Sequence, residues 1–261
     1  MGIVFLTLRL PYLTKSDFKA CFDCRTKLLY RKNGYPMSNA KTIESLYTAF
    51  INQLKDRNRI YLLPFDRQEW FRGAYSTIQR TLRDNFSPLN EAKKSECANL
   101  LFQKIPRLSG QDFDQKLKSL IRETAKDFKV SIGHSQKLIS ILTKYAAACH
   151  RHSEAKMPKD WKSFAQSEFG RLPVPIDAVV LCQLKARYPQ KFSDVEAGTR
   201  KDKKDRPTYW AKVGIGKDSQ AWSRISDYDT YWSLQERIRE LAKDQKVAPL
   251  EFEMRHLWVT E

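Results

Sequence analysis

Apolar residues recur three and four positions apart along most of this chain, which is the period of an α-helix with one buried face. The pattern predicts two helices within residues 42–86, broken near Pro64, and a further helix over 112–128. Their buried faces are expected to carry Leu46, Phe50, Leu54, Trp70, Phe71, Tyr75, Ile78, Leu82, Phe113, Leu117, Leu120, Ile121 and Phe128.

The second half of the chain predicts three more helices. One follows a tight turn at Gly133, with Ser135 as its N-cap and an apolar stripe made of Leu138, Ile139, Leu142, Tyr145, Ala146 and Cys149. Another begins at the N-cap Asp177 and ends before Pro189. The last carries Tyr228, Tyr231, Leu234, Ile238 and Leu241. Residues 200–206 are expected to form a solvated charged loop, and the alternation typical of strands is scarce, so the fold is predicted to be mainly α.

The charge of the chain indicates a polyanionic partner. There are 47 Lys and Arg residues against 30 Asp and Glu residues, which gives a formal net charge of +17. Because each neutralised phosphate releases condensed counterions, nucleic acid is the first candidate, and DNA is the partner we expect. No apolar run approaches the length of roughly 20 residues that spans a bilayer, so no membrane association is expected. Nothing indicates an obligate protein partner.

Residues 1–48 form a basic and aromatic N-terminal segment of unassigned role, and residues 49–261 are expected to form the helical domain. The opening MGIVFLTLRLPYL is short and carries Arg9, which favours a buried segment over a signal peptide. The five cysteines are an odd set, which is typical of a reducing compartment, and we expect a cytoplasmic protein. Cys21 and Cys24 form a CxxC motif without a second pair.

Lys137 and Asp177 are the candidate catalytic residues. A lysine amine is a nucleophile only when unprotonated, and the positive potential at a helix N-terminus, where Lys137 is expected, favours that form. Asp177 is expected to stay ionised because it caps a helix whose backbone amides point toward it. Breaking a glycosidic bond needs both a nucleophile and a negative charge beside the sugar cation. The alternative interpretation is a solvent-facing lysine and a plain N-cap.

The segments SIGHSQKLISILTKY and LPVPIDAVVL, within residues 130–181, resemble the helix-hairpin-helix DNA glycosylase superfamily, particularly its archaeal 8-oxoguanine glycosylase branch. The resemblance implies a helical fold of two subdomains, with the hairpin and catalytic helix at 130–150, and excision of a flipped base by cleavage of its N-glycosidic bond. It gives Lys137 the part of the Schiff-base lysine and Asp177 that of the catalytic aspartate, and it implies no cofactor. The chain departs from the pattern in its single hairpin glycine, Gly133, and in the forty residues between Lys137 and Asp177. The four-cysteine iron–sulfur motif of some relatives is absent.

The resemblance implies further candidates at the hairpin, and residue type adds aromatic ones. The hairpin residues expected to contact DNA phosphate are Gly133, His134, Ser135 and Gln136. The aromatic residues expected to stack on a flipped base are Trp161, Trp222 and Trp232, with core packing as the ordinary alternative. No metal site is expected, because Cys149, His150 and His152 are too close along one helix to face a single ion.

Two other functions stay open. The segment LTKSDFKACFDCRTKLLYRKNGYP resembles the N-terminal part of some bacterial PD-(D/E)XK nucleases, and Glu91 and Lys93 fit half of such a metal site, although a helix start is expected there. A non-catalytic nucleic-acid-binding protein would also explain the basic charge. Within the glycosylase hypothesis, the sequence leaves open the target base, an additional abasic-site lyase activity, and a role in DNA repair or in defence against phage with modified DNA.

Overall fold

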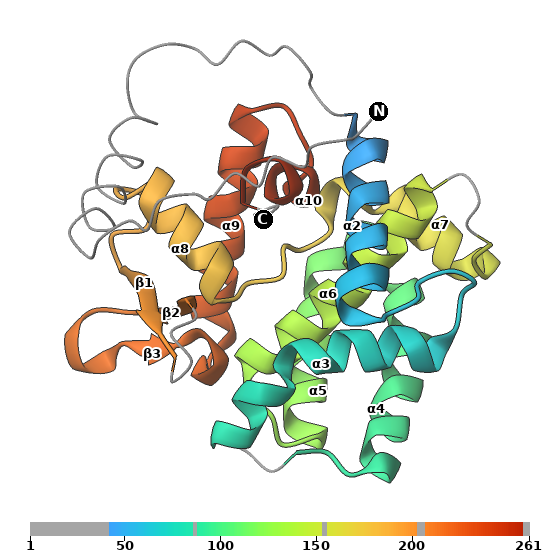
Figure 1. Cartoon of the computed structure of the whole chain (residues 1–261), viewed down its shortest axis with the longest axis horizontal. Coiled ribbons are helices and arrows are strands. Elements are labelled where there is room, and N and C mark those ends of the chain that lie inside the picture. Colours follow the sequence, from blue (N-terminus) through green and yellow to red (C-terminus); the bar gives the residue numbers. More distant parts are fainter. Residues whose placement is uncertain (1–41, 86–87, 153–155, 203–206, 258–261) are drawn as a thin grey trace, which may run out of the picture. The chain divides into compact units, whose positions relative to one another are not determined.

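The computed structural model describes residues 42–85, 88–152, 156–202 and 207–257. These residues belong to one compact unit, Lys41–Glu261, which is mainly helical (Figure 1). Its helices are α2 Ile43–Asn58, α3 Arg67–Asn85, α4 Glu91–Lys104, α5 Phe113–Asp127, α6 Ile132–Arg151, α7 Lys159–Ser167, α8 Ala178–Arg187, α9 Tyr228–Asp244 and α10 Pro249–Phe252. The predicted mainly α class is therefore confirmed, whereas the glycosylase-like arrangement of two subdomains stays a prediction. Helix α2 spans the expected boundary between residues 48 and 49.

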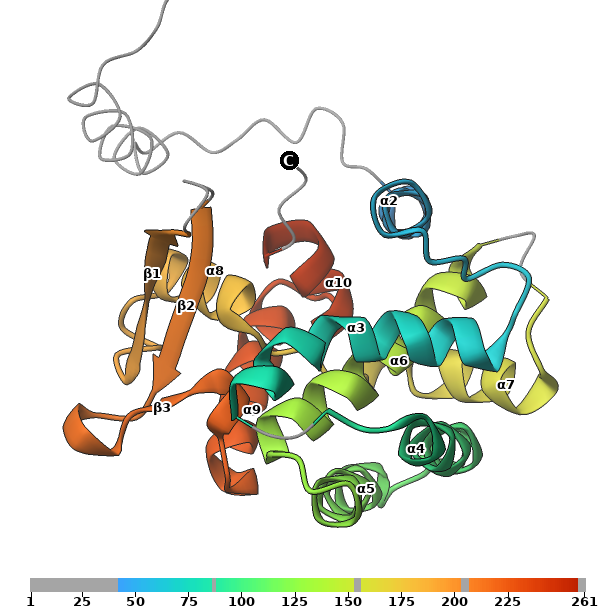
Figure 2. The same cartoon turned by 60° about the horizontal axis from the view of Figure 1, so that its bottom comes forward.

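Helix α6 is the central element of the unit. It contacts α2, α3, α5 and α7, which lie around it (Figures 1 and 2). The predicted apolar stripe is buried throughout, and burial extends to two lysines of the same helix, Lys137 and Lys144. A helix that is buried on nearly every side places its polar residues in contact with other elements, so these two lysines need partners inside the protein.

The start of α6 differs from the expectation. The helix begins at Ile132, and its N-cap is Ser131, whose side chain accepts a hydrogen bond from the amide of His134. The expected turn at Gly133 and N-cap at Ser135 are therefore wrong. Gly133 serves close packing instead: a Cβ at this position would lie 2.0 Å from the carbonyl oxygen of Trp222. The Gly133 amide donates to the carbonyl of Ile225 at 3.1 Å, which fixes residues 222–225 against the first turn of α6.

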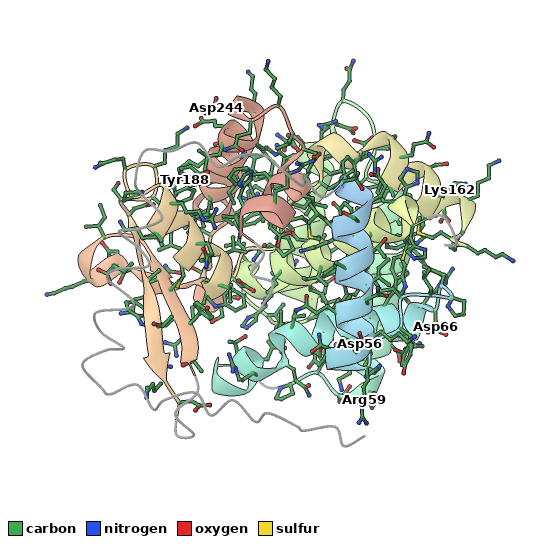
Figure 3. All side chains as sticks on the ribbon, turned by 45° about the horizontal axis from the view of Figure 1, so that its top comes forward. Asp56, Arg59, Asp66, Lys162, Tyr188 and Asp244 are labelled. Atoms are coloured by element: carbon green, nitrogen blue, oxygen red, sulfur yellow. The ribbon has the colours of Figure 1, made fainter. Side chains whose placement is uncertain are left out.

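Aromatic rings form the middle of the core beside α6. The rings of Trp70 and Trp161 meet edge to face with centroids 5.5 Å apart; Phe102 packs on both rings, and Tyr145 packs on Trp70. Large aromatic rings bury much apolar surface, so this cluster is a main source of stability. Most charged side chains lie at the periphery instead, as Figure 3 shows for Asp56, Arg59, Asp66 and Lys162, and the buried Lys137 and Lys144 are exceptions.

A small antiparallel sheet, which the sequence did not predict, packs against α8. Its strands are β1 Val195–Lys201, β2 Pro207–Val213 and β3 Gln220–Ala221, in the order β1-β2-β3. Arg200 and Lys201 belong to β1 and pair with Thr208 and Pro207, so the expected loop over 200–206 is wrong in its first two residues. The sequence did not predict this part of the strand because residues 199–201 are polar and exposed, so they show no alternation of apolar and polar positions.

Candidate active site

A cleft of about 880 Å³ opens between α3, the start of α8 and the β1–β2 hairpin. Its floor includes Lys137 of α6 and the 3₁₀ turn at Trp222–Arg224. Among the described residues, five basic side chains and two acidic ones line it, so the cleft attracts anions. The charged lining residues are Arg80, Lys137, Arg200, Lys201, Arg224, Asp177 and Asp202.

The structure brings the two candidate catalytic residues together in this cleft. The Nζ atom of Lys137 lies 3.0 Å from Oδ2 of Asp177. The Lys137 side chain is 9% exposed and that of Asp177 is 24% exposed, so the pair is recessed but open to the cleft. Nζ also lies 3.4 Å from the carbonyl oxygen of Thr77 and 4.8 Å from the centre of the Trp222 ring. An ammonium over an aromatic face is held by the ring quadrupole.

Asp177 is the N-cap of α8, as the sequence predicted. Its Oδ1 accepts a hydrogen bond from the amide of Val180 at 3.0 Å, which leaves Oδ2 for Lys137. Burial raises the pKa of this carboxyl, but the Lys137 ammonium and the amides of Val180 and Val179 lower it further, so that its pKa lies below the ordinary value of aspartate. The carboxylate form is therefore the one that faces the cleft at neutral pH.

Two buried glutamines hold the segment that leads to Asp177, and no pattern in the sequence indicates this role. The side-chain amide of Gln136 donates to the carbonyl of Ile176 at 2.9 Å and accepts from the amide of Ile176 at 3.4 Å. Gln235 of α9 pairs in the same way with both backbone groups of Val174. Such paired hydrogen bonds replace strand pairing for this extended segment, which would otherwise bury unsatisfied backbone groups.

The four residues expected to contact phosphate lie inside the protein. His134, Ser135 and Gln136 are buried, and Gly133 is packed against the carbonyl of Trp222. Because α6 starts earlier than predicted, these residues face neighbouring elements instead of a hairpin surface. The Ser135 hydroxyl, for example, donates to the carbonyl of Ile121 at 2.7 Å. The structure therefore does not support the expected contact of these four residues with phosphate.

His134 lies beneath the cleft in a hydrogen-bond chain. The hydroxyl of Ser131 lies 2.6 Å from the carbonyl oxygen of Ser223 and must donate its proton there, so its oxygen accepts from Nδ1 of His134 at 2.8 Å. The other ring nitrogen, Nε2, lies 3.0 Å from the hydroxyl oxygen of Thr81, whose single proton has two acceptors in reach, this nitrogen and the carbonyl oxygen of Ile78 at 3.0 Å. Burial, with the nearby charge of Lys137, lowers the pKa of His134 to about 4. The imidazole is therefore neutral, and it joins α3 to the 222–224 turn below Lys137.

Only one of the three candidate tryptophans, Trp222, lines the cleft. Trp161 belongs to the aromatic core, where its ring meets that of Trp70. Trp232 stacks on Tyr228 with centroids 5.6 Å apart and carries the guanidinium of Arg239 on its face. Core and surface packing explain these two residues, so the expected stacking on a base remains for Trp222 alone.

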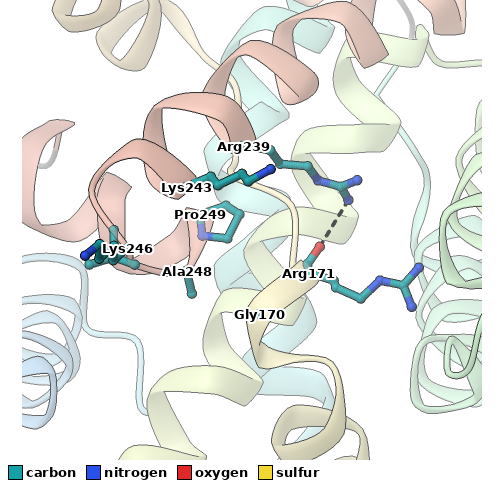
Figure 4. Close-up of a pocket in the computed structure, with 8 residues that line it drawn as sticks. Gly170, Arg171, Arg239, Lys243, Lys246, Ala248 and Pro249 are labelled. Carbon is teal, nitrogen blue, oxygen red and sulfur yellow. Dashed lines mark hydrogen bonds between the residues drawn. The ribbon is translucent and has the colours of Figure 1, made fainter.

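A second pocket, of about 440 Å³, lies at the end of α9 and is also basic. Figure 4 shows that its cations do not converge: Arg171 and Arg239 point to one side and Lys246 to the other. Both oxygens of Asp114 pair with Arg239 at 2.9 and 3.0 Å, so that charge is already neutralised. This pocket is a weaker candidate for chemistry than the cleft.

The nuclease alternative finds no metal site in the part of the chain that the structure describes. Glu91 and Lys93 lie in the first turn of α4 and not on a strand. The described residues contain no group of three His, Cys, Asp or Glu side chains that could hold a metal ion. Cys21 and Cys24 and the segment that resembles these nucleases lie outside the described residues.

Within the residues that are described, no helix is both long and apolar enough to cross a membrane.

Comparison of the chain with protein-family models, with curated protein sequences and with solved structures gives no match. The resemblance of residues 130–181 to helix-hairpin-helix glycosylases therefore stays a prediction.

Proposed function

We propose that this protein is a DNA glycosylase that excises a damaged or modified base, with Lys137 and Asp177 as its catalytic residues. The observation that supports the proposal best is the 3.0 Å contact between Lys137 Nζ and Asp177 Oδ2 inside a basic cleft. A lysine and a carboxylate forty residues apart in sequence meet where a ligand can reach both. A cleft of about 880 Å³ lies within the range of small-molecule sites and has room for one extruded nucleotide.

The pair can supply both the acid and the nucleophile. In the resting pair the lysine is an ammonium, which cannot attack. As the bond between C1′ and the base nitrogen breaks, its electrons go to the base, which takes up a proton from the Lys137 ammonium. The amine left behind forms a bond to C1′ and passes its second proton to O4′. The nitrogen lone pair then displaces O4′, so that the C1′–O4′ bond breaks and a protonated Schiff base with the opened sugar remains. Throughout this step, the carboxylate of Asp177 stabilises the positive charge of the sugar.

Base flipping fits the remaining lining of the cleft. Extruding a base costs a few kcal/mol of stacking energy, which an aromatic or apolar wall offsets. Trp222 supplies such a ring beside Lys137, and Tyr209 and Trp210 line the cleft from β2. The basic lining would in addition neutralise phosphates next to the extruded nucleotide.

The proposal is tested with a panel of oligonucleotides that carry damaged or modified bases, incubated with the full chain and then with borohydride. We expect base release on at least one substrate and a covalent adduct that is lost in Lys137→Gln. An abasic product without an adduct would assign the attack to water and leave Asp177 as the stabilising charge. The panel also distinguishes the two cellular roles. Release of a damaged base would indicate repair, and release of an enzymatically modified base of the kind found in phage DNA would indicate defence.

The matched control is Lys144→Gln. Lys144 is a second buried lysine of α6 that pairs with a carboxylate, but it does not line the cleft. Loss of the adduct in Lys137→Gln and its persistence in folded Lys144→Gln would separate chemistry from stability. Undiminished base release by both Lys137→Gln and Asp177→Asn would overturn the assignment, and binding without release on every substrate would favour the non-catalytic alternative.

A further inference from the structure

Two arginines on separate elements line the cleft. Arg80 belongs to the end of α3, and Arg200 belongs to β1, which Figures 1 and 2 show apart from α3. Both side chains are exposed, and neither guanidinium has a hydrogen-bond or ion-pair partner among the described residues. The hydroxyl of Thr208 donates to the carbonyl of Arg200 at 2.9 Å, so the backbone that carries this guanidinium is fixed.

Two other arginines of the unit, Arg237 and Arg239, are neutralised within the protein. Both guanidinium nitrogens of Arg237 contact the carboxylate of Asp194, at 2.6 and 3.1 Å, and Arg239 pairs with Asp114 in the same bidentate way. These two arginines thus have carboxylate partners, whereas the two guanidiniums that line the cleft with Lys137 and Asp177 have none among the described residues. An uncompensated cation on the wall of a concave site raises the local concentration of anions and is available to pair with a ligand.

We infer that Arg80 and Arg200 bind the two phosphates on either side of the target nucleotide, so that the ligand is an internal nucleotide of a DNA strand and not a free nucleoside. This inference rests on the proposed function, which places the target beside Lys137. A guanidinium matches two phosphate oxygens with parallel N–H donors, and one arginine on each wall holds a strand that crosses the cleft. A free nucleoside offers no phosphate to either arginine.

The first test is DNA binding of the full chain, measured by fluorescence anisotropy on an unmodified oligonucleotide over a series of KCl concentrations. Each phosphate contact contributes about 0.7 to 0.9 to the slope of log affinity against log salt. Arg80→Ala and Arg200→Ala are each expected to lower the slope by about that amount and to weaken binding about threefold at physiological salt. The control is Arg107→Ala, an exposed arginine that does not line the cleft. Slopes and affinities of both cleft variants equal to those of Arg107→Ala would overturn the inference.

The second test assigns each arginine to one phosphate. An oligonucleotide with a single stable abasic-site analogue fixes the register, because that position flips at little cost. A neutral methylphosphonate is placed on the 5′ or the 3′ side of the analogue. On either side, the methylphosphonate should weaken binding of the wild type. On one side it should have no further effect in Arg80→Ala, and on the other side it should have no further effect in Arg200→Ala, because the arginine that contacts that phosphate is already absent. Independent, multiplying effects at both sides would contradict the assignment.

Both tests measure binding alone, so their outcome is independent of base release. Arginine-dependent binding without excision on any substrate would contradict the proposed function and leave the phosphate contacts in place. Excision of a base from a free nucleoside as efficiently as from an oligonucleotide would contradict the inference and support the proposed function.

Discussion

Two lysines of α6, Lys137 and Lys144, each pair with a carboxylate, but the two pairs differ in their exposure and in their backbone surroundings. Lys137 meets Asp177 at 3.0 Å and Lys144 meets Glu253 at 2.6 Å, seven residues further along the same helix. The first pair lines the cleft, with side chains 9% and 24% exposed, whereas those of the second are 4% and 6% exposed. A pair that a ligand can reach is available for chemistry, and a sealed pair can contribute only to the fold.

The two carboxylates also differ in their backbone surroundings. Asp177 caps α8 and receives amide hydrogen bonds, which together with Lys137 hold its pKa below the ordinary value. Burial raises the pKa of Glu253, and the ammonium of Lys144 offsets this only in part, so the pKa of Glu253 lies above its ordinary value. Similar pairs thus acquire different protonation behaviour because a helix N-terminus stabilises a negative charge and a closed core does not.

The largest expected effect is on the rate of base release. Lys137→Gln is expected to lower the single-turnover rate by about a thousandfold or more, because removal of a nucleophile commonly costs that much, and Asp177→Asn should cost somewhat less. Lys144→Gln, assayed as folded protein, should keep the wild-type rate. Equal losses in Lys137→Gln and Lys144→Gln would show that both pairs act through stability and would erase the difference between them.

Stability should show the reverse order. Lys144→Met leaves the carboxylate of Glu253 buried without its cation, which is expected to cost about 3–5 kcal/mol of unfolding free energy in urea. Lys137→Met should cost less, because Asp177 retains its amide donors and contact with solvent in the cleft. The double variant Lys144→Met/Glu253→Leu should recover much of the loss, since it removes both buried charges. A larger cost at Lys137 than at Lys144 would contradict this order.

His134 should make the cleft end of α6 sensitive to acid. Its pKa of about 4 lies below the value near 6.5 of an unfolded chain, so the unfolded state binds more protons between these pH values. Unfolding free energy should therefore fall by up to about 3 kcal/mol as the pH drops from about 6.5 to 4, and change no further through this group below that.

The measurement that checks this is urea unfolding of the wild type and of His134→Gln at several pH values. The variant should lose the His134 part of the slope over that window, and Thr81→Val, which keeps the imidazole, should retain most of it. An unchanged slope in His134→Gln would assign the acid sensitivity to other groups.

The sequence predicted what depends on neighbours along the chain. The stripe from Leu138 to Cys149 is buried on α6, and Asp177 caps α8, because apolar period and N-cap chemistry are local properties. The sequence-based prediction was wrong at the start of α6. Ser131 and Ser135 are both suitable N-cap residues, and the packing of Gly133 against Trp222 favours Ser131. The prediction also missed the strands at Arg200 and Lys201, whose pairing with β2 no local pattern records.

Only the tertiary structure decided which side chains meet. The resemblance to a glycosylase family suggested Lys137 and Asp177 as a pair, and the fold brings them to 3.0 Å across forty residues of sequence. The sequence held no sign that Gln136 holds the approach to Asp177 or that Lys144 is sealed with Glu253. Helices form from contacts a few residues apart, which periodicity records, whereas a cleft forms where distant elements fail to pack together, and no local pattern encodes that.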